Sequence, residues 1–274
     1  YKENVYRVLH SGSGFKEIMQ TGLECIGDID MYATGEVIML AASGLEAVSS
    51  EYILDISHIG ITAGILKDTD EEISEAILKA MSEKNMPAFK KICEKGRLAP
   101  GKKHLLEQFI RLYEPIGTGI EILKNMELPE ESQNAVRELE ALCDVLKLYG
   151  IEDNIYLDFS IVCDTDYYNG IFFKGYIAGI AESVLSGGRY DNLMHRMGKE
   201  AGAIGFAVYL NRFEELEAGT EIYDADVLIT YSEDSDMAKI IETAESCIAE
   251  GKSVRVQKNT GARTKEVIEI GADN

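Results

Sequence analysis

Positive charge is what this sequence has least of for its size. Its 274 residues include 27 lysines and arginines against 48 aspartates and glutamates, so the formal net charge is -21 at pH 7. Nucleic-acid binding depends on Lys and Arg to neutralise phosphates, and so acidic a chain opposes it unless basic residues gather locally. No such basic patch is evident in the sequence, and no nucleic-acid partner is expected.

Cysteine is scarce, and long apolar runs are missing. The five cysteines form no C-x-x-C pair, and none of the four histidines stands at metal-ligand spacing, so neither a disulfide framework nor a metal site is predicted. This pattern favours a reduced, cytoplasmic protein without a metal or other cofactor. No apolar run approaches the roughly 20 residues that a membrane-spanning helix needs. The hydrophobic content of 46% and the charged content of 27% are those of an ordinary globular protein.

The most informative stretch covers residues 163–193, CDTDYYNGIFFKGYIAGIAESVLSGGRYDNL. Its run at 171–177 is rich in β-branched and aromatic residues, which predicts a central strand. A turn precedes this strand, and the Ser-Gly-Gly-Arg-Tyr-Asp string after it is predicted to be a second turn that opens into a helix. A buried hairpin with core tyrosines is the alternative for each residue taken singly.

The two turns could together form a pocket for a small amino acid. Gly187 and Gly188 have no side chain, so their backbone amides can approach a ligand closely. Tyr167 and Tyr168 supply flat aromatic surfaces that carry hydroxyl groups.

A second polar pattern lies on the predicted return strand at 17–26, which follows a strand at 1–9. At period two, Gln20, Gly22 and Glu24 share one face of this strand. A solvent-facing hairpin and the floor of a pocket fit this pattern equally well. In a pocket, Gly22 would make room while Gln20 and Glu24 accept hydrogen bonds from a cationic ligand.

Further elements follow from periodicity. Residues 68–150 are predicted to be helical almost throughout, and the acidic surface of this block is interpreted as a solvated face, with a partner-docking surface as the alternative. The alternating segment at 155–161 predicts a half-polar strand that borders the same pocket. Residues 203–217 are predicted to form an amphipathic helix. His58, at the end of a short strand, is interpreted as a hydrogen-bonded structural residue rather than a catalytic base.

The C-terminal part predicts a strand at 225–231, a helix at 234–250 and a strand at 253–257. Residues 266–270 could form another strand. The connection NTGART is too short for a crossover helix, so either antiparallel pairing or missing residues are expected.

Taken together, these motifs resemble the histidyl-tRNA synthetase family. Segment 163–193 is similar to the family's histidine-recognition segment, a VRGLDYYTG string followed by a strand and GGRYD. NVYR followed by FKEIMQTGLECIG resembles the second signature motif of class II aminoacyl-tRNA synthetases, and 203–217 resembles the third. The likeness is closer still to the non-synthetase branch, the regulatory subunit of ATP phosphoribosyltransferase.

The resemblance implies an α+β fold, a class II synthetase-like antiparallel sheet flanked by helices. This domain is expected at 1–218, with a helical insertion at about 68–150, followed at 222–274 by part of a small α/β domain similar to the synthetases' anticodon-binding domain. Because Tyr1 leads into a strand pattern without a methionine, an N-terminal part is expected to be missing.

The resemblance also implies roles for individual residues. Gln20 matches the residue that binds the α-amino group of histidine and Glu24 the one that binds its imidazole. Tyr167, Tyr168 and the Gly187-Gly188 pair match the rest of that site. Two arginines match contacts to ATP phosphates, which makes Arg7 and Arg212 a vestigial ATP site.

This sequence departs from the synthetase pattern at residues that, in synthetases, help to activate histidine with ATP. Cys163 stands where synthetases carry an arginine that assists attack of the histidine carboxylate on ATP, and Asp164 beside it adds negative charge. Leu9 replaces an acidic residue expected two places after the motif arginine. Removal of one well-placed electrostatic group costs on the order of hundreds to a thousandfold in rate.

The resulting hypothesis is a regulatory subunit with no activity of its own. It would assemble, as a homodimer within a hetero-oligomer, with the short-form catalytic subunit of ATP phosphoribosyltransferase in the first step of histidine biosynthesis. L-histidine would be its ligand and the signal for feedback inhibition. Two alternatives remain open: an active histidyl-tRNA synthetase that forms histidyl-adenylate, and a stand-alone amino-acid-binding or scaffold protein.

Overall fold

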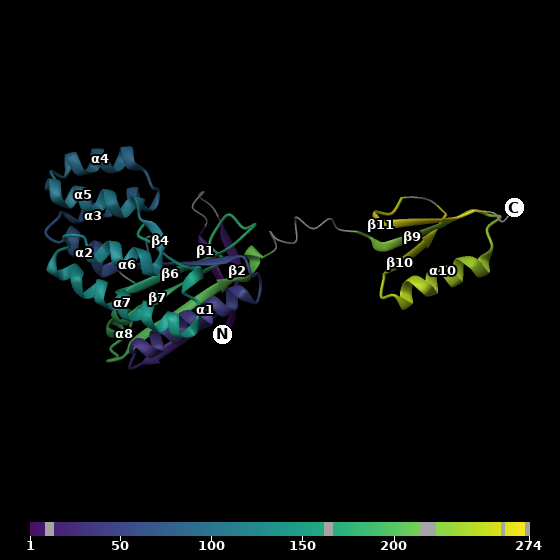
Figure 1. The fold of residues 1–274 in the computed structure, drawn as a ribbon, viewed down its shortest axis with the longest axis horizontal. Coiled ribbons are helices and arrows are strands. Elements are labelled where there is room, and N and C mark those ends of the chain that lie inside the picture. Colours follow the sequence, from purple (N-terminus) through teal and green to yellow (C-terminus); the bar gives the residue numbers. More distant parts are fainter. Residues whose placement is uncertain (9–13, 162–166, 214–222, 259–260, 272–274) are drawn as a thin grey trace. The chain divides into compact units, whose positions relative to one another are not determined.

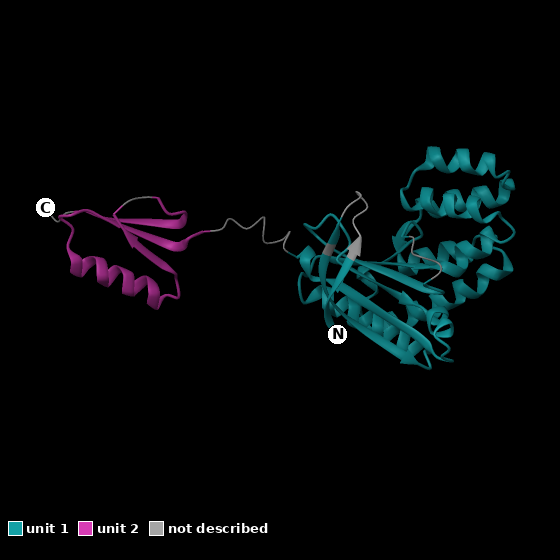
Figure 2. Ribbon diagram, turned by 180° about the vertical axis from the view of Figure 1, so that it is seen from behind, with its two compact units in different colours: residues 1–216 teal, residues 217–274 magenta. Residues whose placement is uncertain are grey.

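The computed structural model describes residues 1–8, 14–161, 167–213, 223–258 and 261–271, without the side chains of residues 7, 8 and 16. The chain divides into two compact units, residues 1–216 and residues 217–274, which Figure 2 colours separately. Each unit is described by itself.

The first unit is built on one eight-stranded sheet with the strand order β1-β2-β8-β7-β6-β3-β5-β4 (Figure 1). Among the described strands all neighbours run antiparallel except β3 and β5. The strands are β1 (Lys2–Val8), β2 (Phe15–Gly27), β3 (Tyr52–His58), β4 (Tyr113–Pro115), β5 (Ile155–Asp158), β6 (Ile171–Ile177), β7 (Leu185–Arg189) and β8 (Gly202–Tyr209).

Helices cover one face of this sheet. Helix α1 (Met31–Glu46) packs against β2, β3, β6 and β8, and α7 (Glu130–Tyr149) packs on α1. Gly175 of β6 allows this close packing, since a Cβ there would lie 2.6 Å from a methyl carbon of Leu45. Helices α2 (Ile59–Leu66), α6 (Ile116–Lys124) and α8 (Asp191–Arg196) and the short 3-10 helices η1 (Glu152–Asn154) and η2 (Leu210–Arg212) complete the unit around the sheet.

The face opposite α1 carries the polar side chains of the strands. Strand register aligns Glu24 with Gly205, Gly205 with Gly188, and Gly188 with Phe172 across four neighbouring strands. Side chains alternate along a strand, so residues in this row point to the same side, away from Leu45. The pleat therefore separates an apolar face under the helices from a face available for ligands.

Three helices form the outer part of the insertion: α3 (Glu71–Ser82), α4 (Met86–Lys95) and α5 (Pro100–Arg111). Their starts are marked in the sequence. Asp70 accepts a hydrogen bond from the amide of Glu72 (3.0 Å), and Asn85 accepts one from the amide of Ala88 (3.0 Å). Phe109 of α5 meets Phe159 at 4.6 Å between ring centroids, so the insertion shares the apolar core of the sheet.

His58 has the structural role predicted for it. Its Nδ1 accepts a hydrogen bond from the amide of Gly60 (3.1 Å) at the start of α2, and its Nε2 lies 3.0 Å from Glu138 Oε2. The side chain is buried and faces α7 rather than the open side of the sheet.

Two predicted elements are wrong. Residues 203–217 do not form one helix, because 202–209 are strand β8 and only the 3-10 turn η2 follows in the described residues. Strand β8 lies between β2 and β7, and a short apolar run of this kind cannot be told from a buried helix by periodicity alone. The strand predicted at 155–161 ends at Asp158, whose Oδ1 accepts a hydrogen bond from the amide of Ser160 (2.7 Å) and turns the chain.

The polar side chains of β5 form a separate cluster and do not border the cavity described below. Asp158 Oδ2 accepts a hydrogen bond from Lys84 Nζ (3.1 Å), and Tyr156 stacks on Tyr113 at 5.1 Å. Asp55 lies beside them, buried, and its Oδ1 has no hydrogen-bond partner. Burial is the larger cause, and the negative charge of Asp158 the smaller one, that raises the pKa of Asp55 to about 7.

The second unit is a three-stranded parallel sheet with the order β10-β9-β11: β9 (Ala225–Tyr231), β10 (Val254–Gln257) and β11 (Thr264–Ile270). Helix α10 (Met237–Ala249) packs Ile240 and Cys247 against β9. Strand β11 pairs with β9 in parallel, so the antiparallel pairing predicted as one alternative for the last strand is wrong. The start of β11 lies roughly 20 Å from the end of β10, back along β9 and across it, and a connection of six residues can span roughly 23 Å without a helix.

The Asp55 cluster makes folding stability depend on pH. The folded pKa of Asp55, about 7, lies above its ordinary value of 3.8, so the folded state binds the proton more tightly. This contribution is complete below about pH 4 and is lost as the pH rises through about 7. We expect Asp55→Asn to remove a component on the order of 2 to 4 kcal/mol from the pH dependence of the unfolding free energy.

Urea denaturation between about pH 4 and pH 8 measures this component. The exposed Asp153→Asn serves as the matched control and should retain the wild-type slope. An Asp55→Asn variant with the slope of the wild type would contradict the assignment.

Candidate functional site

A cavity of about 500 Å³ opens on the face of the sheet opposite α1. Strands β2 and β8 form its floor, and the chain at 167–168 and 190 lines its sides. The described lining residues are Tyr1, Gln20, Glu24, Tyr167, Tyr168, Phe172, Ser186, Tyr190, Gly205, Phe206, Ala207 and Tyr209. Four predicted site residues, Gln20, Glu24, Tyr167 and Tyr168, are thus brought together from segments about 145 positions apart in the sequence.

Gln20 lines this cavity and carries an acceptor that no donor uses. Its Nε2 donates a hydrogen bond to Tyr1 Oη (3.1 Å), whereas its Oε1 is buried and has no hydrogen-bond partner. A buried acceptor left without a donor costs about 1–3 kcal/mol. A ligand that brings an N–H group to this atom, such as the ammonium of an amino acid, would recover that energy.

Glu24 lies further along β2 on the same face. Its Oε2 accepts a hydrogen bond from Tyr190 Oη. Burial raises the pKa of Glu24, and the hydrogen bond from Tyr190 opposes that rise. Gly205 lies directly against this carboxylate, with no room for a side chain between them. One carboxylate oxygen is thus held by the protein, and the other is available to a donor on a ligand.

Tyr190 is the functional candidate that sequence reasoning missed. Burial, and to a smaller extent the hydrogen bond to Glu24, raise the pKa of Tyr190 far above the ordinary value of tyrosine. The Tyr190 hydroxyl therefore stays protonated and donates a hydrogen bond to Glu24. The signal was present, because Tyr190 belongs to the same GGRYD string as Gly187 and Gly188. Two hydrogen bonds hold the backbone at Tyr190 in place. The Tyr190 amide donates to the carbonyl of Ala203 (2.8 Å), and the Asp191 carboxylate accepts from the amide of Ala203 (2.9 Å).

Aromatic rings line the side of the cavity next to Tyr190. Tyr167 stacks on Tyr190 at 5.3 Å and meets Tyr168 edge-on at 4.6 Å, and Tyr168 in turn lies 4.9 Å from Phe172. Burial raises the pKa of Tyr167, with a smaller contribution from Glu24. The walls are therefore neutral and flat, which suits a planar ring.

Gly187 and Gly188 lie in strand β7 and not in a turn, which corrects the predicted local structure. Neither is among the described lining residues of the cavity. A Cβ on Gly188 would lie 2.8 Å from Tyr168 Cδ1, and one on Gly187 would lie 2.6 Å from the ring of Phe173. In the structure these glycines allow close packing, and Gly188 determines where Tyr168 can lie.

The residues assigned to ATP are only partly described. Arg212 forms an ion pair with Glu182 and lines a second cavity of about 340 Å³, which shares Ser186 and Tyr209 with the first. Arg7 lies in β1, but its side chain is outside the description. Leu9, Cys163 and Asp164 also lie outside the described residues.

The chemical character of the first cavity follows from its lining. It has one carboxylate, one unsatisfied amide oxygen and several phenols, and its described lining includes no lysine and no arginine. Such a site can recognise a small cationic molecule with a planar ring, but its described lining supplies no lysine or arginine to stabilise developing negative charge. Within the described part of the chain, no cluster of three His, Cys, Asp or Glu side chains could hold a metal ion, and no helix is long and apolar enough to cross a membrane.

Comparison with known proteins shows the family of this chain. The family model described as histidyl-tRNA synthetase matches residues 1–213. The ATP phosphoribosyltransferase regulatory subunit of Geobacillus thermodenitrificans is 31% identical over 267 residues, 96% of this chain and 67% of the relative. The chain belongs to the regulatory-subunit branch of the histidyl-tRNA synthetase family.

Solved structures confirm the predicted fold class. A crystal structure titled as an ATP phosphoribosyltransferase regulatory subunit/histidyl-tRNA synthetase from Bacillus halodurans superposes with a TM-score of 0.71 at 27% identity. It covers 99% of this chain and 73% of that chain. The ATP phosphoribosyl transferase (HisG:HisZ) complex from Thermotoga maritima matches with a TM-score of 0.59 at 22% identity, over 77% of this chain and 72% of that chain. The second match supports the fold alone.

The contact between Gly205 and Glu24 leads to a prediction. An added Cβ in Gly205→Ala would occupy the position of the Glu24 carboxylate and displace it from Tyr190. Overpacking of this kind costs typically 1–3 kcal/mol, which a urea titration of the variant should show. Gly117→Ala is the matched control, because a Cβ at this helical position meets no atom within 4 Å. Equal stability changes in the two variants would contradict the described packing.

Proposed function

We propose that this protein is a non-catalytic regulatory subunit of ATP phosphoribosyltransferase that binds L-histidine in the Glu24 cavity. It works with the short-form catalytic subunit in the first, cytoplasmic step of histidine biosynthesis and helps to carry feedback inhibition by histidine. The observation that carries the proposal is a cavity with a carboxylate held by a tyrosine hydroxyl and an unsatisfied amide oxygen, but no lysine or arginine in its described lining. The names of the relatives support the assignment.

Histidine matches the polar groups of the cavity one by one. An imidazole N–H donates to Glu24, whose second oxygen is held by Tyr190, and the α-ammonium group donates to Gln20 Oε1. Tyr167 and Tyr168 flank the ring. Gly187 and Gly188 contribute indirectly, because the lack of a side chain at Gly188 leaves room for the Tyr168 ring.

The neighbouring cavity at Arg212 is proposed to be a vestigial ATP site together with Arg7. Glu182 already neutralises Arg212 and would compete with a phosphate for it. An arginine that faces a carboxylate gains little from an added anion, because the ion pair must first be broken.

The second candidate, an active histidyl-tRNA synthetase, is favoured by the shared fold but not by the chemistry. Activation of histidine brings a carboxylate and ATP together, and this needs positive charge close to the reacting atoms. Cys163 occupies the sequence position of the synthetases' assisting arginine, and the described lining offers no substitute.

Feedback inhibition requires that histidine bind one quaternary state better than another. Couplings of this kind are typically about 1–3 kcal/mol. A homodimer within a hetero-oligomer would supply the two states, and the cavity would supply the difference in affinity.

Ligand binding can be tested on the protein alone. L-histidine should raise the melting temperature of the wild-type protein, because a ligand that binds only the folded state stabilises it. Glu24→Ala should abolish this shift, since it removes the acceptor for the imidazole. The matched control is Glu46→Ala, an exposed glutamate at the end of α1, which should keep the full shift. The absence of any shift in the wild type would count against histidine as the ligand.

Two assays separate the candidate functions. Assembly with the short-form catalytic subunit, together with histidine-dependent inhibition of the complex, is expected of the regulatory subunit and not of a stand-alone binding protein. Histidine-dependent pyrophosphate exchange is expected only of the synthetase. Exchange activity in the purified full-length protein would overturn the proposal.

A further inference from the structure

One part of this acidic protein is strongly basic. Residues 84–111 contain eight lysines and arginines but only two glutamates, which leaves 19 basic residues against 46 acidic ones in the rest of the chain. The acidic surface predicted for the whole insertion, and the predicted absence of a basic patch, are both wrong for this segment. The segment covers helices α4 and α5 and their connection.

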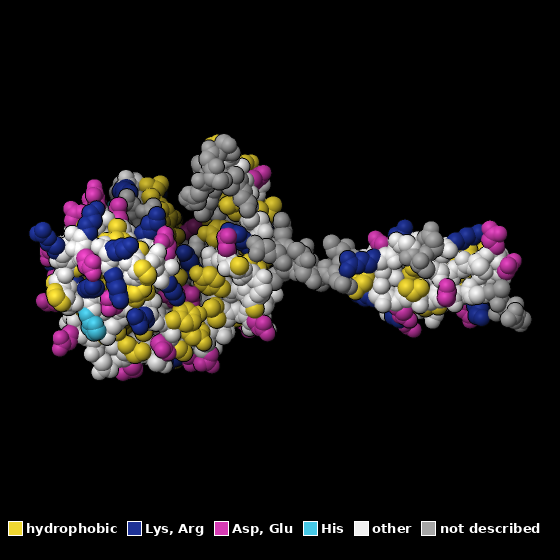
Figure 3. Space-filling model, turned by 90° about the horizontal axis from the view of Figure 1, so that it is seen from above, with side chains coloured by type: hydrophobic (Ala, Val, Ile, Leu, Met, Phe, Trp, Pro, Cys, Tyr) yellow, Lys and Arg dark blue, Asp and Glu magenta, His cyan; other side chains and the backbone are white. Residues whose placement is uncertain are grey.

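Six of these eight cations are exposed, and Lys102 and Lys103 are half-buried. Figure 3 shows dark blue side chains gathered over the part of the molecule that holds α4 and α5. We call the surface formed by six of them, none with an ion-pair partner among the described residues, the α4–α5 basic face: Lys90, Lys91, Lys95, Arg97, Lys103 and Arg111.

Helical periodicity explains why the charges point outward. Phe89 and Cys93 of α4 are buried in the insertion, so Lys91 and Lys95, two positions after each of them, occupy the opposite side of the helix. Figure 1 shows α4 as the outermost helix of this block. Nothing in the described fold covers the basic face.

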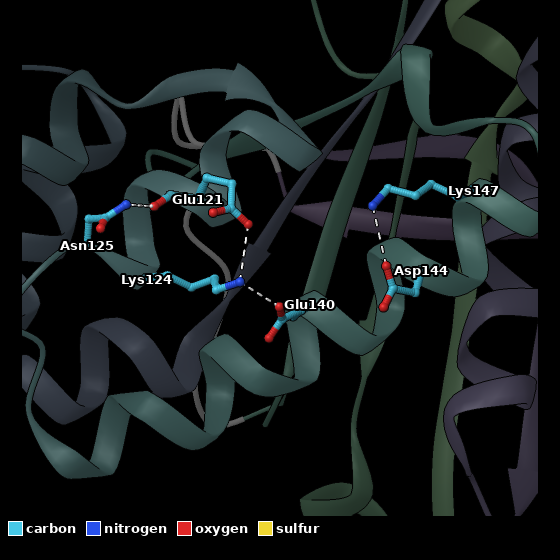
Figure 4. A network of polar contacts seen from close by, with 6 residues as sticks. All are labelled: Glu121, Lys124, Asn125, Glu140, Asp144 and Lys147. Carbon is cyan, nitrogen blue, oxygen red and sulfur yellow. Dashed lines mark hydrogen bonds and ion pairs between the residues drawn. The ribbon is translucent and has the colours of Figure 1, made fainter.

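Lysines on helices α6 and α7, in contrast, form ion pairs with nearby carboxylates. In α6 and α7, Lys124 Nζ contacts Glu121 (3.2 Å) and Glu140 (2.8 Å), and Lys147 contacts Asp144 (3.3 Å), as Figure 4 shows. The chain as a whole is rich in acidic residues, but the segment that carries the α4–α5 basic face contains only two glutamates. Its positive charge is therefore left for a partner.

We propose that the α4–α5 basic face docks an acidic surface of the catalytic subunit. This inference rests on the function proposed above and adds the surface through which the two chains meet. Complementary charge raises association rates and fixes orientation, and its effect falls with ionic strength. The remaining surface of the protein, rich in acidic residues, would repel the same acidic partner and so direct it to this face.

A protein partner fits the face better than a nucleic acid. Proteins that bind single strands place exposed aromatic rings among the basic residues for base stacking. The two phenylalanines of these helices, Phe89 and Phe109, are both completely buried. A long polyanion would also extend over the acidic surroundings, whereas a compact acidic protein surface need touch only α4 and α5.

The test is a charge reversal with a matched control. Lys91→Glu combined with Lys95→Glu reverses two exposed charges on α4, and Lys2→Glu combined with Lys199→Glu makes the same change in net charge at exposed lysines elsewhere. At low ionic strength the α4 variant should bind the catalytic subunit about tenfold more weakly or worse, with a flatter salt dependence. The control should stay within about twofold of the wild type. A wild-type histidine-induced melting shift in the α4 variant would show that it is folded.

Three outcomes would overturn the inference. If the wild type assembles with the catalytic subunit but the α4 variant binds equally well, the docking surface is wrong while the proposed function stands. If the wild type does not assemble at all, both fail together. If the wild type binds a total tRNA preparation and the α4 variant loses that binding without losing the catalytic subunit, the face serves a nucleic acid instead.

Discussion

The pairing of β2 with β8 is the constraint on which the site depends. It places Glu24 against Gly205, the only residue type whose lack of a side chain leaves space for the carboxylate. From the next strand, β7, the chain continues directly to Tyr190, whose hydroxyl binds Glu24. A shift of register by one residue would turn both Gln20 and Glu24 toward the helices, so the cavity exists only in this alignment.

The same alignment explains why one face of the sheet is apolar and the other carries the polar groups of the cavity. Apolar residues under α1 supply the core, and the polar groups that line the cavity lie on the opposite side of the sheet. Where polar groups are buried outside the cavity, as at Asp55, the protein compensates through a raised pKa and neighbouring lysines. Charge at the surface is divided as well, between a largely acidic molecule and the α4–α5 basic face.

Much of this could be predicted from the sequence, and the failures have physical causes. Gln20 and Glu24 were found because strand periodicity and the family resemblance agreed on them, Tyr167 and Tyr168 because a turn motif and the resemblance did, and all four line one cavity. Strand β8 was taken for a helix because a short apolar run, buried on both faces, carries no period that separates the two. Tyr190 was missed because its partner, Glu24, is 166 positions away. The basic face was missed because net charge was averaged over the chain.

Calorimetric titration of the purified protein with L-histidine and with ATP tests the central claim most directly, namely that this cavity still recognises histidine but no longer activates it. The account predicts saturable binding of one histidine per chain, no pyrophosphate release when ATP is added, and loss of the histidine signal in Glu24→Ala. Pyrophosphate released from ATP in the presence of histidine, or the absence of any histidine binding both alone and with the catalytic subunit, would contradict it.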